Sequence, residues 1–405
     1  MQTKLAADII ATPQGQAADR ILRSCVHCGF CTATCPTYQL LGDELDSPRG
    51  RIYLIKQMLE GEPVTSKTQT HLDRCLTCRS CETTCPSGVQ YGKLIDIGRE
   101  LVEQRVSRSP LQQLKRFALR KIVPYPRRFA ALVKLGNLAK PLLPAALQLK
   151  LPALPAAPAR VTGSHARKML IVEGCAQSVA TPGTNAATVG LLDRLGIQAI
   201  VAAEAGCCGA VSQHLAAPAE AQEFMRRNID AWWPHVEQGA EAIIATASGC
   251  GVMVKDYGAL LQDDAAYADK AQRISALTRD IVEVLANEDL GKLGIQPGKV
   301  KVAFHCPCTL QHGQKLGGKT EALLVKLGFE LTSVADSHLC CGSAGTYSVL
   351  QPELSQQLLQ NKLAALQQGR PDVIVTANVG CQMHLASGAG VGVRHWIELL
   401  SESVA

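Results

Sequence analysis

The sequence predicts an α+β protein of several domains, in which a helical, cysteine-rich N-terminal domain precedes a duplicated α/β unit. The chain has 405 residues, which is more than one ordinary domain holds. Two cysteine runs share one spacing, and a strand–helix–cysteine pattern occurs twice further along. Apolar residues make up 47% of the chain and aromatic residues 4%, which favours α/β packing over a β-sandwich. The expected segments are a cysteine-rich domain (1–103), a basic linker (104–167) and two α/β (Rossmann-like) repeats (168–298 and 299–405).

The cysteine runs are "CVHCGFCTATCP", from Cys25 to Pro36, and "CLTCRSCETTCP", from Cys75 to Pro86. Both follow C-x2-C-x2-C-x3-C-P, the spacing that is typical of [4Fe–4S] clusters in bacterial ferredoxins. Three thiolates on one short loop bind one cluster, and the fourth binds the other cluster. The predicted ligands are Cys25, Cys28, Cys31 and Cys85 for the first cluster, and Cys75, Cys78, Cys81 and Cys35 for the second.

Structural zinc is the competing interpretation of these runs, because zinc also binds C-x2-C pairs. Zinc needs only four ligands in total, so two runs of three cysteines plus one, each followed by proline, fit it poorly. Between the runs, apolar residues after Pro48 recur at helical spacing, so the two-cluster domain is expected to be helical.

The seventeen cysteines are expected to be reduced rather than paired in disulfides. Their number is odd, they are closely spaced, and the N-terminus lacks the basic and apolar pattern of a signal peptide. The chain also lacks an apolar run of the roughly 18 residues that a membrane helix needs. We therefore expect a cytoplasmic, metal-bearing protein.

The segment from Gln104 to Val172 contains fourteen Lys and Arg and no Asp or Glu. Its first part predicts short amphipathic helices that are broken at prolines, and Leu143 to Arg160 predicts an extended Pro/Ala linker. Such charge asymmetry indicates a partner or a surface rather than a fold. Three interpretations remain open: a solvated linker that covers the cluster domain, docking onto an acidic partner subunit, and adsorption to anionic lipid. Nucleic acid is not an expected partner, because no base-reading motif accompanies the charge.

The repeat brings cysteines to the expected carboxyl ends of strands in each copy. "KMLIVEGC" and "KVAFHCPC" run from a strand into cysteine, and "AGCCG" and "HLCCG" follow with equal spacing in the two copies. Because ligands bind at this edge of open α/β sheets, we expect the thiols of each copy to converge. The second copy is the stronger candidate for a third iron–sulfur or zinc centre (Cys308, Cys340, Cys341, Cys381 and His384), and the first is the weaker one (Cys175, Cys207, Cys208 and Cys250).

Cysteines at strand ends can also be small apolar core residues, but two Cys-Cys-Gly motifs at matched spacing favour a metal or redox site. "GQKLGGKT" satisfies the phosphate-loop pattern, yet it does not follow a strand directly, so we interpret it as a helix start. No G-x-G-x-x-G follows a predicted strand, and no catalytic side-chain set is evident, so a flavin or nicotinamide site is not expected on this chain.

Together, "CVHCGFCTATCPTYQLLGDELDSPRGRIYLIKQ", "DRCLTCRSCETTCPSGV", "EAGCCGAV", "AFHCPCTLQH" and "SHLCCGSAGTY" resemble one family over nearly the full length. It is the family of iron–sulfur subunits of respiratory 2-hydroxy-acid dehydrogenases, most closely those of bacterial glycolate oxidase. The iron–sulfur subunit of anaerobic glycerol-3-phosphate dehydrogenase, lactate-utilisation proteins and heterodisulfide reductase subunits have a similar architecture.

The resemblance implies an electron-transfer subunit with two [4Fe–4S] clusters and no catalytic residue of its own. FAD-binding partner subunits would oxidise glycolate, or a similar acid such as D-lactate, and electrons would pass to a membrane quinone. This implies a peripheral location on the inner face of the cytoplasmic membrane. In heterodisulfide reductase relatives the repeat ends in C-x-x-C and can hold an unusual cluster, whereas here Met253 and His384 replace the last cysteine.

Two further functions remain as alternatives. The first is a heterodisulfide-reductase-like subunit whose own centre, in the Cys-Cys-Gly repeats, carries out thiol or disulfide chemistry. The second is a redox-sensing scaffold without turnover.

Overall fold

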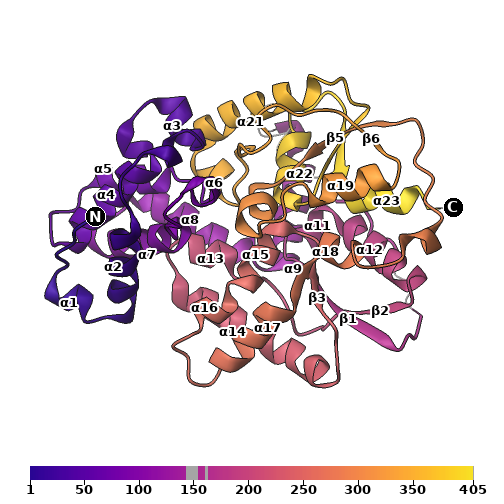
Figure 1. The fold of residues 1–405 in the computed structure, drawn as a ribbon, viewed down its shortest axis with the longest axis horizontal. Helices are drawn as coiled ribbons and strands as arrows, with labels where there is room; N and C mark the ends of the chain where they lie inside the picture. Colours follow the sequence, from indigo (N-terminus) through magenta and orange to yellow (C-terminus); the bar gives the residue numbers. More distant parts are fainter. Residues whose placement is uncertain (143–153, 160–162, 405) are drawn as a thin grey trace.

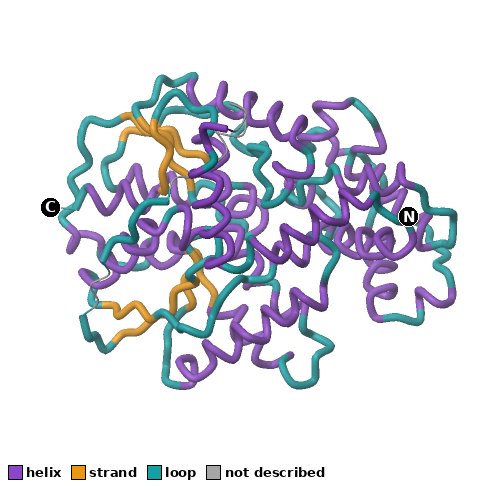
Figure 2. Tube along the Cα trace, turned by 180° about the vertical axis from the view of Figure 1, so that it is seen from behind, coloured by secondary structure: helices purple, strands orange, loops and turns teal. Residues whose placement is uncertain are grey.

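The computed structural model describes residues 1–142, 154–159 and 163–404, which form a helical domain and two α/β halves (Figure 1). The helical domain is indigo and lies at one end of the molecule, with the second half, orange to yellow, above the first half. The strands form two separate groups, both away from the N-terminal domain (Figure 2). The predicted α+β class with a helical N-terminal domain is confirmed.

Short helices that begin at proline or at a polar cap make up the N-terminal domain. The predicted helix after Pro48 is present, and Ser47 caps it by accepting a hydrogen bond from the Gly50 amide at 3.0 Å. Its apolar side chains pack against α2 and α7 in one buried core. The elements are α1 (Ala7–Ile10), α2 (Pro13–Ser24), η1 (Phe30–Thr32), α3 (Pro36–Leu41), η2 (Glu44–Asp46), α4 (Pro48–Leu59), α5 (Ser66–Asp73), α6 (Ser80–Thr84) and α7 (Tyr91–Arg105).

The basic segment forms two helices that begin at prolines, as predicted: α8 (Pro110–Ile122) and α9 (Pro126–Leu138), followed by η3 (Lys140–Leu142). The predicted Pro/Ala linker lies largely outside the described residues. One side of α8 is held by ion pairs, from Arg116 to Asp73 at 2.7 Å and from Arg120 to Glu220 at 2.9 Å. Through these ion pairs, part of the segment's positive charge joins the helical N-terminal domain (the cluster domain) to the first α/β half.

Each α/β half contains a four-stranded parallel sheet, and the strand order is the same in both: β2-β1-β3-β4 and β6-β5-β7-β8. The matching order supports the internal repeat seen in the sequence. The strands are β1 (Arg167–Val172), β2 (Ile197–Ile200), β3 (Ile243–Ala245), β4 (Thr278–Asp280), β5 (Lys301–His305), β6 (Glu330–Leu331), β7 (Val373–Thr376) and β8 (Gly392–His395).

The two halves share one hydrophobic core. Ile171 and Ile244 of the first sheet belong to the same buried cluster as Phe304 and Val375 of the second. Burying this apolar surface jointly stabilises the halves as a pair. The helices and turns around the sheets are α11 (Gln177–Ala180), α12 (Pro182–Arg194), α13 (Ala210–His214), α14 (Pro218–Glu237), α15 (Ser248–Lys255), α16 (Tyr257–Leu260), α17 (Ala268–Leu277), α18 (Ile281–Leu285), η4 (Leu290–Leu293), η5 (Thr309–Gly313), α19 (Lys319–Lys326), α20 (Tyr347–Leu350), α21 (Pro352–Gln367), α22 (Val379–Ala386) and α23 (Trp396–Glu402).

Among the described residues, every helix is too short or too polar to cross a bilayer.

Candidate iron–sulfur centres

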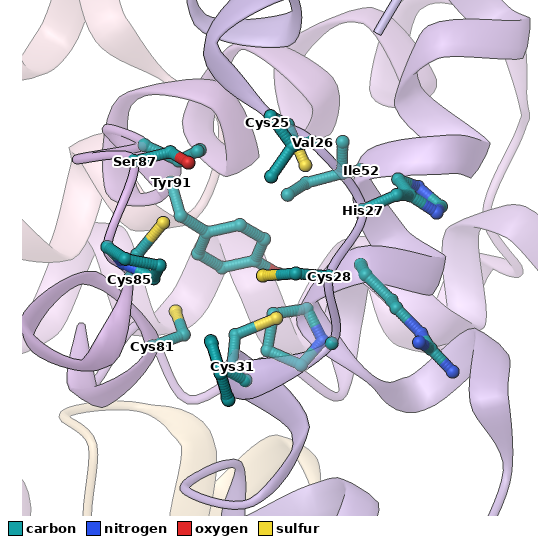
Figure 3. A pocket seen from close by; sticks show the side chains of 16 residues that line it. Cys25, Val26, His27, Cys28, Cys31, Ile52, Cys81, Cys85, Ser87 and Tyr91 are labelled. Atoms are coloured by element: carbon teal, nitrogen blue, oxygen red, sulfur yellow. The ribbon is translucent and has the colours of Figure 1, made fainter.

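The first cluster pocket lies where α2, η1 and α6 end or begin. Its lining includes the four cysteines predicted for the first cluster, and the pocket encloses about 420 Å³ including its opening to solvent. Figure 3 shows their sulfur atoms around one space, with the Tyr91 ring and Cys81 beside it. Cys28 is exposed and Cys25 is buried, so this pocket has one side open to solvent.

The second pocket lies deeper in the same domain. Its lining includes the four cysteines predicted for the second cluster: Cys35, Cys75, Cys78 and Cys81. Cys81 also lines the first pocket, so the two pockets are adjacent. The fourth cysteine of each run thus lies with the first three of the other run, as the ferredoxin pattern requires.

The two cysteine loops have the same backbone conformation. His27 and Gly29 in the first loop have positive φ values of 59° and 88°, and Thr77 and Arg79 have values of 53° and 59° at the equivalent places. Left-handed residues turn the chain sharply and are costly except at glycine. Both loops therefore hold strained turns that wrap the chain around a common centre.

A buried polar network surrounds the second pocket. Arg51 is fully buried, donates to Asp46 Oδ1 at 3.2 Å and has Nη1 3.9 Å from Cys35 Sγ. Asp46 also accepts from Arg74 at 2.8 Å. The Tyr91 hydroxyl donates to Cys75 Sγ at 3.5 Å. Cationic and hydroxyl donors next to sulfur stabilise negative charge on a cluster.

The donor set fits iron–sulfur clusters. Burial and the neighbouring thiols raise the pKa of Cys31 to about 11 and the pKa of Cys78 and Cys81 well above the usual value for a thiol. Four thiolates packed this closely are stable only when a metal's positive charge offsets their repulsion. No cysteine forms a disulfide among the residues that the structure describes, and all seventeen thiols are free.

The first α/β half brings its four predicted cysteines together. Cys175 Sγ lies 3.5 Å from Cys207 Sγ, and the thiols of Cys208 and Cys250 are close enough to shift the pKa values of this group. Cys250 lies in the first turn of α15, just after β3, and the others lie in loops after β1 and β2. The thiols therefore meet at the carboxyl edge of the sheet.

The second half has an equivalent group of neighbouring thiols. Cys308 Sγ lies 4.0 Å from Cys340 Sγ, and the thiols of Cys341 and Cys381 are close enough to shift the pKa values of this group. His384, the candidate ligand from the sequence, has Nε2 3.2 Å from Ser355 Oγ.

A different imidazole, that of His305, joins this group of thiols. Its ligand atom and those of Cys341 and Cys381 all lie within 4.8 Å of one another. His305 Nδ1 is 2.9 Å from Thr376 Oγ1, and no hydrogen-bond partner for the buried Nε2 occurs among the described residues. Burial lowers the pKa of His305 to about 3, so the ring is neutral and Nε2 can act as a ligand.

The glycine of each Cys-Cys-Gly motif is required by the backbone. Gly209 and Gly342 have φ values of 91° and 89°. A Cβ on Gly342 would lie 2.6 Å from the Ser355 carbonyl oxygen. Only glycine allows this turn so close to helix α21, and the turn places both adjacent cysteines at the sheet edge.

The second pocket packs directly against the second half. Cys78 and Leu76 share a buried cluster with Cys308, Cys340 and Tyr347. The Thr83 hydroxyl also lies 2.9 Å from His312 Nδ1 across the same boundary. The second ferredoxin pocket and the thiols of the second half are therefore neighbours.

Sequence reasoning missed several residues at these sites. Arg51, Asp46 and Tyr91 lie outside the cysteine runs, and no spacing marks them as neighbours of sulfur. The only sequence signal for Asp46 is its place just before the Ser47–Pro48 helix start.

Comparison with known proteins supports the same division of the chain. The profile of the 4Fe-4S dicluster domain matches residues 21–89, and that of the Cysteine-rich domain matches residues 169–255 and 302–386. The chain is 58% identical to the glycolate oxidase iron-sulfur subunit of Escherichia coli, over 100% of this chain and 99% of that protein.

Two further relatives are more distant. A probable glycolate oxidase iron-sulfur subunit of Bacillus subtilis is 30% identical, over 91% of this chain and 89% of its own length. Lactate utilization protein A of Bacillus licheniformis is 32% identical, over 53% of this chain and 91% of its own length.

Proposed function

The chain belongs to the family of glycolate oxidase iron–sulfur subunits, and from this membership we propose that it transfers electrons in a complex that oxidises glycolate or a similar small 2-hydroxy acid. The substrate is oxidised on FAD-binding partner subunits, and this chain carries the electrons toward a membrane quinone. The complex lies on the cytoplasmic face of the cytoplasmic membrane.

The observation that carries the proposal is the pair of adjacent four-cysteine pockets. A [4Fe–4S] cluster supplies one-electron transfer when it is bound. Cys25, Cys28, Cys31 and Cys85 hold the first cluster, and Cys75, Cys78, Cys81 and Cys35 hold the second. Four of these cysteines are buried, and Arg51 and Tyr91 donate to two of them, Cys35 and Cys75.

Solvent exposure indicates which of the two clusters an external partner contacts. The first pocket opens to solvent beside Cys28, whereas the second is covered by the second α/β half. A redox partner approaches the first pocket more closely than the second, so the first cluster is the contact point for an external partner.

A single substitution tests the relay. Cys78→Ser removes one ligand of the second cluster, and the purified complex is expected to lose electron transfer from substrate to a water-soluble dye. Cys306→Ala is the matched control, because Cys306 is the one cysteine outside all the proposed ligand sets. Full dye reduction by the Cys78→Ser complex would contradict the relay, and loss of activity in both variants would point to general damage.

We further propose that the α/β halves hold a third iron–sulfur or zinc centre. The second half is the stronger candidate: the ligand atoms of His305, Cys341 and Cys381 lie within 4.8 Å of one another, and Cys308 Sγ lies 4.0 Å from Cys340 Sγ. His384 is the further candidate ligand from the sequence. The first half offers Cys175, Cys207, Cys208 and Cys250. The heterodisulfide-reductase-like alternative requires such a centre to keep one metal position open for chemistry.

Metal analysis of the anaerobically purified chain tests the third centre. About eight irons per chain, without zinc, means that only the two ferredoxin pockets are filled. About twelve irons, or eight irons and one zinc, with the excess lost on Cys341→Ser, supports a third centre.

A further inference from the structure

Helices α8 and α9 expose an apolar and basic face that the other described residues leave uncovered. Of the large hydrophobic side chains that are exposed among the described residues, six lie on these two helices. Their exposed fractions range from 49% for Leu132 to 81% for Leu138. The six residues are Leu111, Leu114 and Phe117 on α8, and Leu132, Leu135 and Leu138 on α9.

The spacing shows that each helix has one outward apolar side. The three exposed residues of each helix are three positions apart, so each set spans about 120° of the helix surface. The opposite sides face the protein. In α8, Arg116 and Arg120 make the ion pairs to Asp73 and Glu220 there, and in α9 Val133 is buried.

Lysines and arginines flank the apolar side chains. Lys115 lies next to Leu114, and Lys134 lies next to Leu135, both exposed. Arg127 and Arg128 are exposed at the start of α9. No Asp or Glu occurs anywhere between Gln104 and Val172, so the two helices themselves contribute only positive charge.

The position of the helices leaves this face open. α8 contacts α13, and α9 contacts α11, so both helices lie against the first half and run from the cluster domain across it (Figure 1). We propose that this face, named the α8–α9 face, binds the headgroup region of an anionic lipid bilayer. The proposal rests on the peripheral membrane location proposed above and names the surface and the lipid chemistry.

Three features together favour lipid over a protein partner. An amphipathic helix with Leu and Phe on one side and Lys or Arg beside them lies in the plane of a membrane interface. Positive residues near the surface are attracted to anionic headgroups. A protein partner would need an acidic surface that also has an apolar groove large enough to bury six side chains. An anionic bilayer provides negative charge and an apolar interior without a specific fit.

Vesicle binding by the full, anaerobically purified chain tests the proposal. Sedimentation is measured with vesicles of equal parts phosphatidylcholine and phosphatidylglycerol, and with phosphatidylcholine alone. We expect binding to the mixed vesicles at low salt, weaker binding at high salt, and little binding to phosphatidylcholine. The double variant Leu114→Glu with Leu135→Glu is expected to bind at least about tenfold more weakly.

The matched control is Val325→Glu with Val349→Glu, which adds the same charge at exposed apolar residues of α19 and α20. This control should bind like the wild type. Equal loss in both double variants, or no wild-type binding to the anionic vesicles at low salt, would overturn the proposal. A third outcome would also overturn the proposal. If Leu114→Glu with Leu135→Glu prevented assembly with the flavoprotein subunits but left vesicle binding unchanged, the face would be a subunit interface.

The electron relay is assessed separately. Reduced-cluster EPR signals and dye reduction by the Leu114→Glu and Leu135→Glu variant should match those of the wild type, which shows that the variant is folded. If the variant loses vesicle binding but keeps its EPR signals, the result tests the α8–α9 face alone. If the wild type itself lacks the EPR signals, the proposed electron relay is contradicted instead.

Discussion

At the residue scale, the least expected feature is a buried cation beside a cluster sulfur. Arg51 and Asp46 are both fully buried, and two further donors, Arg74 and His71, contact the same carboxylate. A buried carboxylate without partners is expensive, so this group is stable only as a complete network. Its position next to Cys35 links the stability of the domain to the charge on the second cluster.

Arg51→Gln is therefore expected to have two effects. It leaves Asp46 with less positive charge and destabilises the N-terminal domain by about 3 kcal/mol. It also removes a cation near Cys35, which lowers the reduction potential of the second cluster because the reduced cluster carries more negative charge. Thermal unfolding and an EPR-monitored redox titration measure the two effects.

Arg23→Gln is the matched control, because Arg23 pairs with Asp19 at 2.7 Å on the surface. Such an exposed pair contributes less than about 1 kcal/mol. If both variants shifted the unfolding midpoint equally and left the potential unchanged, the assigned role of Arg51 would be wrong.

At the scale of elements, the cluster domain depends on close contact between helices α4 and α7. Gly98 of α7 lies against Ile55, and a Cβ there would come within 2.7 Å of Ile55 Cγ1. Ile55 is fully buried, so it has little room to move aside. The absence of a side chain at Gly98 thus sets the distance between the two helices that carry the core behind both pockets.

Gly98→Ala is expected to destabilise the N-terminal domain by about 1–3 kcal/mol through overpacking. Calorimetry of the purified chain measures this. Gly190→Ala provides the control, because Gly190 is a helical residue of α12 with no atom within 4 Å of its built Cβ. There alanine should stabilise by about 0.5–1 kcal/mol through its helix propensity. A stabilising Gly98→Ala would show that α4 and α7 can separate without cost.

At the scale of the whole molecule, the cluster domain is fastened to both α/β halves. Arg79, beside the proposed ligand Cys78, pairs with Asp256 of the first half at 2.6 Å, and Thr83 contacts His312 of the second. These contacts hold the second pocket against the thiols of the second half. The relative placement of the sites is therefore set by the interface and does not depend on the linker alone.

Asp256→Arg is expected to loosen this interface by placing two cations together. The unfolding midpoint of the cluster domain should fall by about 2–4 °C, and a second transition should separate from that of the α/β halves. Adding Arg79→Asp restores the attraction with the charges exchanged and should recover most of the loss. A double variant no better than Asp256→Arg would show that the pair contributes nothing to docking.

The sequence by itself determined the parts of this protein whose geometry is local. Three thiols within seven residues must surround one centre, and a strand followed directly by cysteine delivers that thiol to the sheet edge. For this reason the α+β class, the duplication and the convergence of eight ferredoxin cysteines into two groups could be predicted from spacing. The helix after Pro48 and the helices of the basic segment followed from caps, prolines and periodicity in the same way.

Only the tertiary structure decided which distant residues meet. Arg51 and Tyr91 reach the sulfurs, and the His305 imidazole joins the thiols of Cys341 and Cys381, because packing between separate elements places them there. In the basic segment, ion pairs on one side of α8 and exposed leucines on the other distinguish two faces that the sequence alone does not place. The contacts of a side chain with distant parts of the fold depend on how the helices and strands pack. The neighbouring residues in the sequence do not determine this packing.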